Sequence, residues 1–459
     1  MNIQELLDAK SWAERTFGGV QLHDLRRTRR TVQAATRMAA DPTGSLPAQM
    51  QTWKETKALY RLLDEPDVNF AALMQPHLQQ TREQANTSAV VLLVQDTTDI
   101  DLSHRRKISG VGQIGNERGR GFFVQTVLAV RPQTREVLGC MAQEPFVRIP
   151  APQGEQRYQR RKREARETDV WMRQVHGIGT AEPGCMWVHV GDRGADMFPF
   201  FQACQATQTY FLVRAAQNRR VQQNEDEITY SLSSARAWPS QASRPLEVPA
   251  RHGRQARATQ LQLAFEQLTL LPPRHEPRAG KDPITVWVIR VWEEQAPEGE
   301  EPLEWILVTS VPTTTLEHAW ERVEWYRQRW LVEDYHQCLK SGCRMEERQL
   351  QSVDGLMRLL GLLSPLAVRL VQIREYARCE PERPAHEVIE PLMLAVLAER
   401  TGQSPLTITT GSFWTEVARL GGYLARRHDG PPGWRTIWKG WLCLQTLLEG
   451  AHLAFHLRL

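Results

Sequence analysis

The sequence lacks the features that define several common protein classes. Its seven cysteines are an odd number and form no CxxC pair; only Cys338 and Cys343 are close together, and no histidine cluster accompanies them. This pattern predicts reduced thiols rather than a disulfide framework or a zinc site. There is also no P-loop, GxSxG motif, internal repeat or low-complexity tract. The sequence therefore gives no indication of a P-loop nucleotidase, an α/β-hydrolase or a repeat protein.

Membrane signals are also weak. The segment MNIQELLDAKSWAERTF carries acidic residues and no apolar core, which argues against a signal peptide. The most apolar stretch, LMRLLGLLSPLAVRLVQI, is interrupted by Arg358, Pro365 and Arg369. Buried helices explain it better than a membrane span. We expect a cytoplasmic protein with no membrane partner.

No strong overall charge is present either. The 459 residues are 41% hydrophobic and 24% charged, and the formal net charge is only +4. Cations nevertheless gather in three separated runs: LRRTRR (Leu25–Arg30), RYQRRKREAR (Arg157–Arg166) and RHGRQAR (Arg251–Arg257). A single run usually lies on a solvated surface, but three runs in a nearly neutral chain favour a partner rich in phosphate.

The pattern of apolar residues changes along the chain. Periodic apolar patterns predict a helical domain over residues 1–75 and another over 378–459. Between them, residues 76–377 alternate strand and helix patterns, which predicts a mixed α/β sheet. At about 217–304 the period changes to two, with proline- and glycine-rich loops, and this predicts a β-rich insertion.

Two of the predicted strands end in an acid. AVVLLVQD ends at Asp96, and MWVHVGD ends at Asp192. Between them, GFFVQTVLAVRP and EVLGCMAQEPFV have the composition of a meander. Taken singly, each acid is more readily explained as a turn or cap residue.

The segment WYRQRWLVEDYHQCLKSG carries a third acid on an amphipathic helix. At roughly 100° per residue, five polar side chains share an arc of roughly 80°: Tyr326, Arg329, Glu333, His336 and Lys340. An apolar stripe on a separate arc should face a core: Leu331, Val332, Tyr335 and Leu339. The polar stripe is either a solvated face with i,i+4 charge pairs or a site for a metal and a polyanion.

Together the three acids suggest a chemistry that none suggests alone. Asp96, Asp192 and Glu333 can supply hard oxygen ligands for two Mg²⁺ ions about 4 Å apart. Such a site activates water or a 3′-hydroxyl and stabilises the leaving oxygen in phosphodiester chemistry.

These motifs resemble a known family. The chain is similar to bacterial insertion-sequence transposases of the DDE type, in the IS-four branch, and to the Tn-five-type cut-and-paste enzymes. The family spacing Tyr–x2–Arg–x3–Glu–x6–Lys is matched without a gap by Tyr326, Arg329, Glu333 and Lys340. DTT at Asp96 and DRGAD at Asp192 match the other two acids, although relatives often carry Glu at the position of Gly194.

The resemblance implies a fold and an activity. The fold would be an RNase H-like catalytic domain with a β-rich insertion, flanked by helical N- and C-terminal domains. The activity would be Mg²⁺-dependent transposition, with Mn²⁺ as a substitute and a two-metal site. Its steps would be strand nicking, hairpin formation and resolution, and strand transfer. The partners would be the inverted repeats at the transposon ends, target DNA and a second copy of the chain in the synaptic complex.

The resemblance also implies DNA contacts around the acids. Arg329 and Lys340 would hold phosphates near the scissile bond, and Tyr326 would donate a hydrogen bond to another phosphate. Trp305 would stack on a base flipped out of the DNA, and Trp330 would help to expel it. Core packing is the alternative for both tryptophans. His336 is not part of the signature and has no assigned role.

More distant contacts are implied in the same way. Arg214 matches a phosphate contact, although an arginine at a strand end is often only solvated. Four N-terminal arginines match contacts to the inverted repeat, with an exposed basic helix as the alternative: Arg26, Arg27, Arg30 and Arg61. In the C-terminal tail, the stripe Trp434, Trp438, Trp441 and Leu448 would pair two protomers or pack within one.

Two other functions remain open at the level of sequence. A DNA-binding regulator descended from a transposase would lack catalysis, but the intact acids and the N-terminal basic region argue against it. A metal-dependent nuclease that cuts without joining would use the same ligands, so sequence separates it poorly. Detection of joined products would distinguish the nuclease from a transposase.

Overall fold

The computed structural model describes residues 6–115, 118–150, 152, 154–156, 159, 166–224, 227–248, 257–276, 279–297, 299–426 and 429–457. Within these residues a single 12-stranded mixed sheet runs through the molecule, in the order β2-β3-β1-β5-β6-β12-β11-β10-β7-β8. Two further pairings lie off this path: β4 with β3, and β9 with β10. The half of the sheet that belongs to the predicted catalytic domain, called the catalytic half below, contains β1 (Val90–Asp101), β2 (Gly112–Ile114), β3 (Gly119–Arg131), β4 (Glu136–Phe146), β5 (Met186–Gly191), β6 (Tyr210–Arg214) and β12 (Glu304–Thr309).

The directions of these strands define the fold. β3 is antiparallel to both β1 and β4, whereas β5 is parallel to β1 and β6 is parallel to β5. The spatial order β4-β3-β1-β5-β6 is therefore an antiparallel meander continued by parallel strands. This confirms the mixed α/β class and the meander, and it is consistent with an RNase H-like domain.

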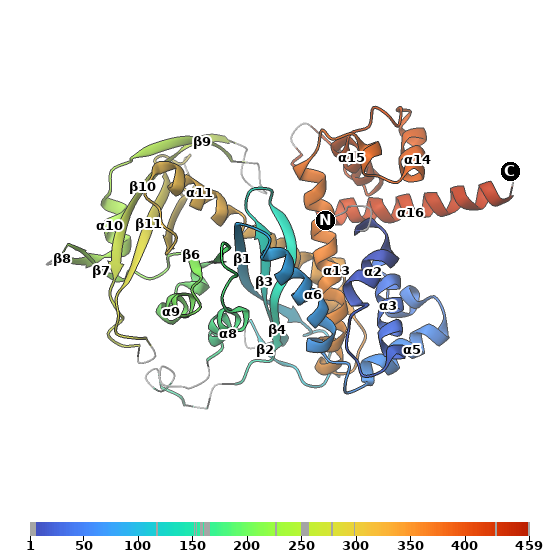
Figure 1. Ribbon diagram of the computed structural model, residues 1–459, viewed down its shortest axis with the longest axis horizontal. Helices are drawn as coiled ribbons and strands as arrows, with labels where there is room; N and C mark the ends of the chain where they lie inside the picture. The colour runs from blue at the N-terminus through green and yellow to red at the C-terminus, as the bar shows by residue number, and fades with distance from the viewer. Residues whose placement is uncertain are drawn as a thin grey trace.

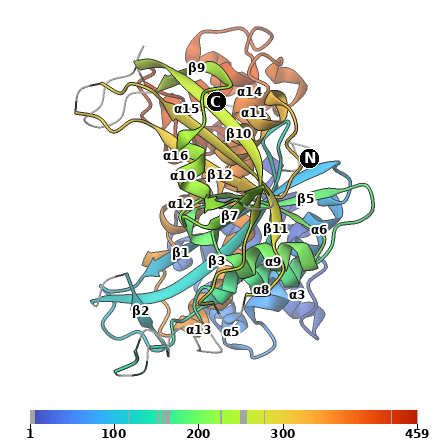
Figure 2. The ribbon, with the colours of Figure 1, turned by 90° about the vertical axis from the view of Figure 1, so that its left-hand side faces the viewer.

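The predicted insertion extends the same sheet. Its strands are β7 (Arg220–Asn224), β8 (Glu227–Tyr230), β9 (Ala242–Val248), β10 (Arg257–Leu270) and β11 (Ile284–Glu293), and it also contains the helix α10 (Ser231–Ala237). β11 pairs antiparallel with β12, which joins the insertion to the catalytic half. Figure 2 views the molecule from this side, with the long strands of the insertion crossing the front.

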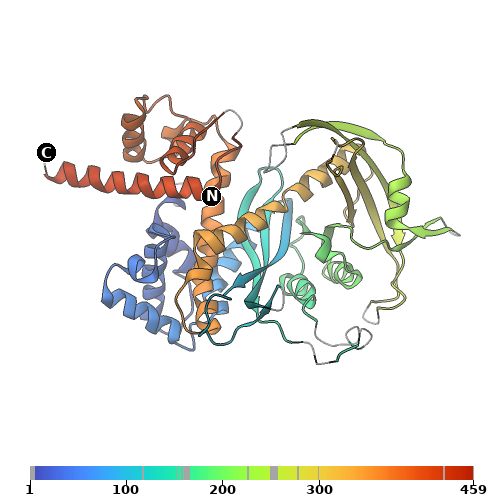
Figure 3. The ribbon, with the colours of Figure 1, turned by 180° about the vertical axis from the view of Figure 1, so that it is seen from behind.

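Helices cover both faces of the catalytic sheet. α8 (Asp169–Ile178) and α9 (Phe198–Ala206) lie on the face seen in Figure 1. On the opposite face lie α11 (Leu316–Arg327), α12 (Trp330–Gln337) and α13 (Val353–Cys379), as Figure 3 shows. Alternate residues of β1 enter different cores, since Leu92 and Val94 belong to the main cluster and Val91 and Leu93 to another. Burial on both faces explains why these strands read as continuous apolar runs.

The N-terminal region is helical, with α2 (Ala9–Phe17), α3 (Leu25–Ala40), α4 (Leu46–Met50), α5 (Trp53–Asp64) and α6 (Phe70–Ala85). α13 lies between α2–α5 and the sheet (Figure 1), whereas α6 packs directly on β4, where the amide of Cys140 donates to Nε2 of His77 at 3.1 Å. Its stretch Val353–Tyr376 is long and apolar enough to cross a membrane by composition, but 89% of its most apolar window is buried inside the fold. α13 is therefore a core helix, as its interrupted hydrophobicity predicted.

Arg369 fixes α13 to the N-terminal helices. Its side chain is fully buried, and its guanidinium donates to the carbonyl oxygens of Leu6, Leu7 and Ala39 at 2.7–2.8 Å. Burial lowers the pKa of Arg369 to about 9. Three buried carbonyls thus depend on one cation for their hydrogen bonds.

The C-terminal helices are α14 (Pro391–Thr401), α15 (Thr410–Leu420) and α16 (Trp434–Leu457). The first part of α16 packs within the monomer, where Trp438 and Trp441 are buried and the ring of Trp441 stacks on Trp414 at 5.4 Å. The rest projects away from the body (Figure 1), and Leu453 on it is 63% exposed. Core packing therefore accounts for part of the predicted stripe. The side chain of Trp434 lies outside the described residues.

Two of the three cationic runs lie mostly outside the described residues. Of Arg157–Arg166 the structure describes only Gln159 and Arg166, and of Arg251–Arg257 only Arg257. Arg257 begins β10 and forms an ion pair with the buried Glu293. This last arginine therefore serves the fold of the insertion.

Candidate active site

Asp96 lies within β1, not at its end. The sequence predicted that the strand stops at Asp96, but β1 continues to Asp101 and pairs residue by residue with β3 down to Gly121. The prediction was wrong because the threonines and isoleucine of DTTDID favour extended structure and find partners on β3. Asp96 is half-buried, and its Oδ1 accepts a hydrogen bond from the amide of Thr97 at 2.9 Å.

Asp192 follows the last residue of β5, as the sequence predicted. Its Oδ1 accepts from the amide of Gly194 at 2.7 Å and thereby caps a short 3₁₀ turn. Because β5 lies beside β1 and parallel to it, this end of β5 faces the same edge as Asp96.

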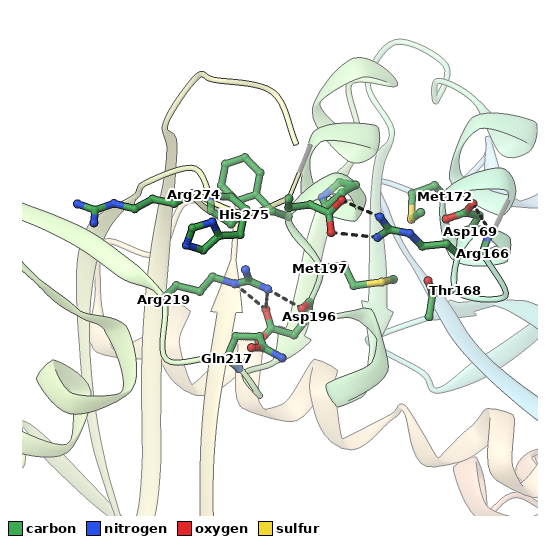
Figure 4. A pocket seen from close by; sticks show the side chains of 14 residues that line it. Arg166, Thr168, Asp169, Met172, Asp196, Met197, Gln217, Arg219, Arg274 and His275 are labelled. Carbon is green, nitrogen blue, oxygen red and sulfur yellow. Dashed lines mark hydrogen bonds and ion pairs between the residues drawn. The ribbon is translucent and has the colours of Figure 1, made fainter. Parts of the chain in front are cut away.

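The second acid of DRGAD fixes the Asp192 loop in place. Asp196 is buried and accepts hydrogen bonds from the amides of Ala216 and Gln217, both at 2.7 Å, and from the Arg219 guanidinium. Figure 4 shows this ion pair beside a cavity of about 350 Å³, where Arg166 is likewise bound by Glu276. Asp196 therefore ties the loop after β5 to the loop after β6.

Glu333 lies on a helix that is less regular than the sequence predicted. α11 ends at Arg327, and a turn at Gln328 and Arg329 leads into α12. A π-helical turn, Cys338–Gly342, then follows and carries Lys340. Irregular helix of this kind is often found at functional sites. The predicted apolar stripe is buried, as expected: Leu331, Val332, Tyr335 and Leu339.

The polar stripe is not a solvated face. Tyr326, Arg329 and His336 are each less than 10% exposed, and Glu333 and Lys340 are half-buried. The interpretation as a solvated charge-paired surface is therefore wrong. The stripe faces the edge of the sheet that carries the two aspartates.

The charges of the other two acids act on Asp96. Burial, together with the nearby carboxylates of Asp192 and Glu333, raises the pKa of Asp96 to about 7 from its usual 3.8. Arg329 and the Thr97 amide act in the opposite direction. A carboxyl that is hard to ionise beside two others indicates a site built to gain positive charge.

Arg329 occupies the position between the acids. Its Nη2 lies 2.5 Å from Oε1 of Glu333, and its buried Nε has no hydrogen-bond partner. Burial alone would lower the pKa of Arg329, but Glu333, Tyr326 and Asp96 raise it overall. A buried donor without a partner leaves a place for an acceptor such as a phosphate oxygen.

The chemical type of these side chains fits a hard divalent cation, because such a cation prefers oxygen ligands and the three acids are carboxylates. In the part of the chain that the structure describes, however, no three acidic, histidine or cysteine side chains are grouped so as to hold a metal ion. Glu333 is instead paired with the Arg329 guanidinium.

Lys340 is paired in a similar way. Its Nζ lies 2.6 Å from Oδ1 of Asp99 and 3.6 Å from Oε1 of Glu346. The sequence prediction overlooked Asp99, although it lies three residues after Asp96 in DTTD. Lys340 therefore lies at the site edge with its charge already neutralised.

The predicted aromatic and arginine contacts surround the acids. The ring of Trp305 meets that of Tyr326 edge-on at 5.5 Å, and Trp330 is 46% exposed with the Arg329 guanidinium 5.1 Å from its ring centroid. Arg214 donates to the carbonyl of Glu304. Burial and the cation Arg193 lower the pKa of Arg214. A cavity of about 300 Å³ beside it is lined by Arg193, Arg214 and Arg236, among others.

The four N-terminal arginines differ in their surroundings. Arg26 is exposed and paired with Asp24 at 2.9 Å, whereas Arg30 donates to Gln33. Arg27 forms ion pairs with Glu65 and with Asp67, the latter at 2.7 Å, so it joins two parts of its own domain. Arg61 is exposed on α5. The structure brings none of these four to the acids.

Two parts of the chain match known family models. Residues 9–68 match the family model described as transposase DNA-binding, and residues 188–368 match the model described as transposase DDE domain. The second match contains Asp192 and Glu333, while Asp96 precedes it. Together, the two matches identify the chain as a DDE transposase, a metal-dependent enzyme of phosphodiester hydrolysis and transesterification with its own DNA-binding domain.

Proposed function

We propose that this transposase, a member of the IS-four branch similar to the Tn-five-type enzymes, moves its element by cut-and-paste. Water would nick one strand at each transposon end, and the freed 3′-hydroxyl would attack the opposite strand to form a hairpin. Water would then open the hairpin, and the 3′-hydroxyl would finally attack target DNA. Each step breaks one phosphodiester bond by attack of a hydroxyl on phosphorus: water leaves a free end, and a 3′-hydroxyl forms a new phosphodiester. A single set of residues can therefore serve all of them.

Asp96, Asp192 and Glu333 would be the metal ligands. Two Mg²⁺ ions held by these oxygens, or Mn²⁺ in their place, would activate the attacking hydroxyl and stabilise the leaving oxygen. The observation that carries the assignment is that β5 lies parallel to β1 with Val94 opposite Val190, which brings Asp96 and Asp192 to the same level of the sheet. The charges of Asp192 and Glu333 also contribute to the raised pKa of the half-buried Asp96.

The remaining site residues would hold DNA. Arg329 has a buried unpartnered Nε for a phosphate oxygen, and Lys340 would exchange Asp99 for a second phosphate. Tyr326 and Arg214 would hold phosphates beside them. Because Trp330 is exposed next to Arg329, it can displace a base. That base would stack on Trp305, which is worth about 1–3 kcal/mol.

The other parts of the chain would complete the complex. Residues 1–75 would bind the inverted repeat through Arg26, Arg27, Arg30 and Arg61, and residues 76–377 would carry out the chemistry. Residues 378–459 would pair two protomers across two ends, because α16 leaves Leu453 exposed on a projecting segment. The enzyme would act on DNA in the bacterial cytoplasm.

The test is cleavage of a supercoiled plasmid that carries the element's own flanking inverted repeats. The full chain would be incubated with Mg²⁺ or with Ca²⁺, as wild type, as Glu333→Gln and as Glu324→Gln. Glu324 is a matched control because it lies on α11, is exposed and pairs only with Arg327 in the described structure. Hairpin-ended excised DNA is expected with Mg²⁺ for wild type and Glu324→Gln, and not for Glu333→Gln.

Each other outcome points to a different function. Nicked or linear DNA without hairpins or joined products would favour a nuclease that only cuts. Binding of the ends without cleavage by wild type would favour the regulator. Equal cleavage by wild type and Glu333→Gln would remove Glu333 from the catalytic set.

A further inference from the structure

A row of polar side chains crosses the sheet at the level of Asp96. Thr126 on β3 is directly opposite Asp96 on β1, and Gln143 on β4 is directly opposite Thr126. Opposite residues of an antiparallel pair project from the same face of the sheet. Thr126 and Gln143 are buried, within strands whose neighbouring residues are largely apolar. Polar residues at such positions require a specific partner.

The partners of these two residues come from α12, which carries Glu333, and from α13. Nε2 of His336 lies 3.2 Å from Oγ1 of Thr126, and the Gln143 amide donates both to Thr126 at 3.0 Å and to the Tyr335 hydroxyl at 2.8 Å. The Ser364 hydroxyl on α13 donates to Oε1 of Gln143 at 2.6 Å. All five side chains are buried. Two strands, β3 and β4, and two helices, α12 and α13, thus meet in one hydrogen-bonded cluster.

The hydrogen-bond roles in this cluster are consistent with one another. Burial, with Lys340 nearby, lowers the pKa of His336 to about 3, so its imidazole is neutral. Thr126 accepts from Gln143, which leaves its own hydroxyl proton to donate to a neutral Nε2 of His336. Removing the Thr126 hydroxyl would leave polar groups of both neighbours without a partner.

The cluster lies one helical turn from Glu333. Residues three apart on a helix are neighbours, so His336 is anchored beside Glu333 and its contact, Thr126, is beside Asp96. Apolar packing holds a helix on a sheet but is non-directional. Hydrogen bonds hold only over a few tenths of an ångström. The cluster therefore selects one position of α12 along the sheet.

We propose that His336 and Thr126 are positioning residues that set the separation between Glu333 and Asp96, so that both carboxylates can hold the same cation. This inference rests on the proposed function, because it takes those two acids as metal ligands. Neither His336 nor Thr126 touches the metal or DNA; each acts through the acid beside it.

The test measures binding of Mn²⁺ alone to the full chain, from the free-ion signal in electron paramagnetic resonance. Thr126→Val removes the hydroxyl at nearly constant volume, and Thr126→Ser keeps it. Loss of an outer-shell partner typically costs about 10–100-fold in metal affinity. We expect a loss of at least about tenfold for Thr126→Val and near-normal affinity for Thr126→Ser, with binding of an end duplex in Ca²⁺ unchanged.

A second pair of variants guards against a simple folding defect. His336→Leu removes the ring nitrogen, and His336→Gln places an amide near the position of Nε2. If Thr126→Val lowers the melting temperature, His336→Leu is used in its place. We then expect His336→Leu to lose Mn²⁺ affinity by at least about tenfold and His336→Gln to restore it. The inference would be overturned if a folded Thr126→Val or a folded His336→Leu bound Mn²⁺ with normal affinity.

Variants of the acids separate this inference from the proposed function. If Asp96→Asn and Glu333→Gln lose Mn²⁺ but Thr126→Val and His336→Leu do not, the metal site stands and the positioning role fails. If Asp96→Asn and Glu333→Gln also bind Mn²⁺ normally, the proposed ligands themselves are wrong.

Discussion

Asp96→Asn should stabilise the metal-free protein while abolishing its activity. In the native state, burial and the neighbouring acids raise the pKa of Asp96 to about 7, against 3.8 for an ordinary aspartate. About three pKa units correspond to roughly 4 kcal/mol of unfavourable free energy when the carboxyl is ionised. Asn is close in size and can still accept from the Thr97 amide. The pKa of about 7 already includes the attraction to Arg329, but burying the Asn amide offsets part of the gain, so we expect about 2 kcal/mol.

The sign of the pH dependence follows from the same shift. Between about pH 4 and pH 7 the native carboxyl keeps a proton that the unfolded chain has lost. The free energy of unfolding of the wild type therefore falls as pH rises through this window, and the full penalty is present above pH 7. The Asn variant lacks this decline. Its advantage should vanish near pH 4 and be largest at pH 8.

The assay is urea denaturation in EDTA between pH 4 and pH 8.5, with Asp64→Asn as a control at an exposed carboxyl on α5. Mg²⁺ in place of EDTA should stabilise the wild type and leave Asp96→Asn unchanged, because only the wild type gains a ligand for the cation. A variant no more stable than the wild type at pH 8, or an advantage that is independent of pH, would refute the reasoning.

Four further substitutions test other charged contacts. Arg329→Gln should raise the Mn²⁺ affinity of the DNA-free protein by freeing Glu333, as read by electron paramagnetic resonance; unchanged affinity would show that the ion pair is not the obstacle. Arg369→Met should cost at least about 3 kcal/mol in urea denaturation, since three buried carbonyls lose their donor; a cost below 1 kcal/mol would contradict this. Arg61→Ala should reduce the slope of log K against log[salt] for end binding by about one, without changing stability. Arg27→Ala should reduce the same slope and also lower the melting temperature, because it loses its ion pairs with Glu65 and Asp67. Equal stability of these two variants would show that the ion pairs of Arg27 contribute nothing.

The order of helices and strands could be predicted where the apolar pattern was strong. The two strands of the meander and the apolar stripe ending at Leu339 follow directly from period and composition. The course of β1 beyond Asp96 could not be predicted, because it depends on pairing with β3. The π-helical turn at Cys338–Gly342 is also outside the reach of periodicity, since an ideal helix was assumed across it.

Sequence motifs identified which side chains matter but not what they contact. Arg27 belongs to a cationic run and was predicted to bind DNA, yet its partners Glu65 and Asp67 lie some 40 residues further along the chain. Thr126 and Gln143 were hidden inside strand patterns, where the only available signal was a polar residue in a buried run. Partners distant in sequence are a property of the fold.

The position of Glu333 beside the cations Arg329 and Lys340 has a physical explanation. Arg329 neutralises Glu333 and Lys340 neutralises Asp99, so the site carries internal ion pairs where the reaction needs a metal and a phosphate. A phosphate that takes Arg329 releases Glu333 for the cation, and a cation on Glu333 releases Arg329 for the phosphate. Binding of DNA and of metal should therefore favour each other by the same factor, because coupling between two sites is reciprocal. Such coupling would keep the affinity of the site for metal low until a DNA end is present, and it uses only the charges of Arg329 and Glu333.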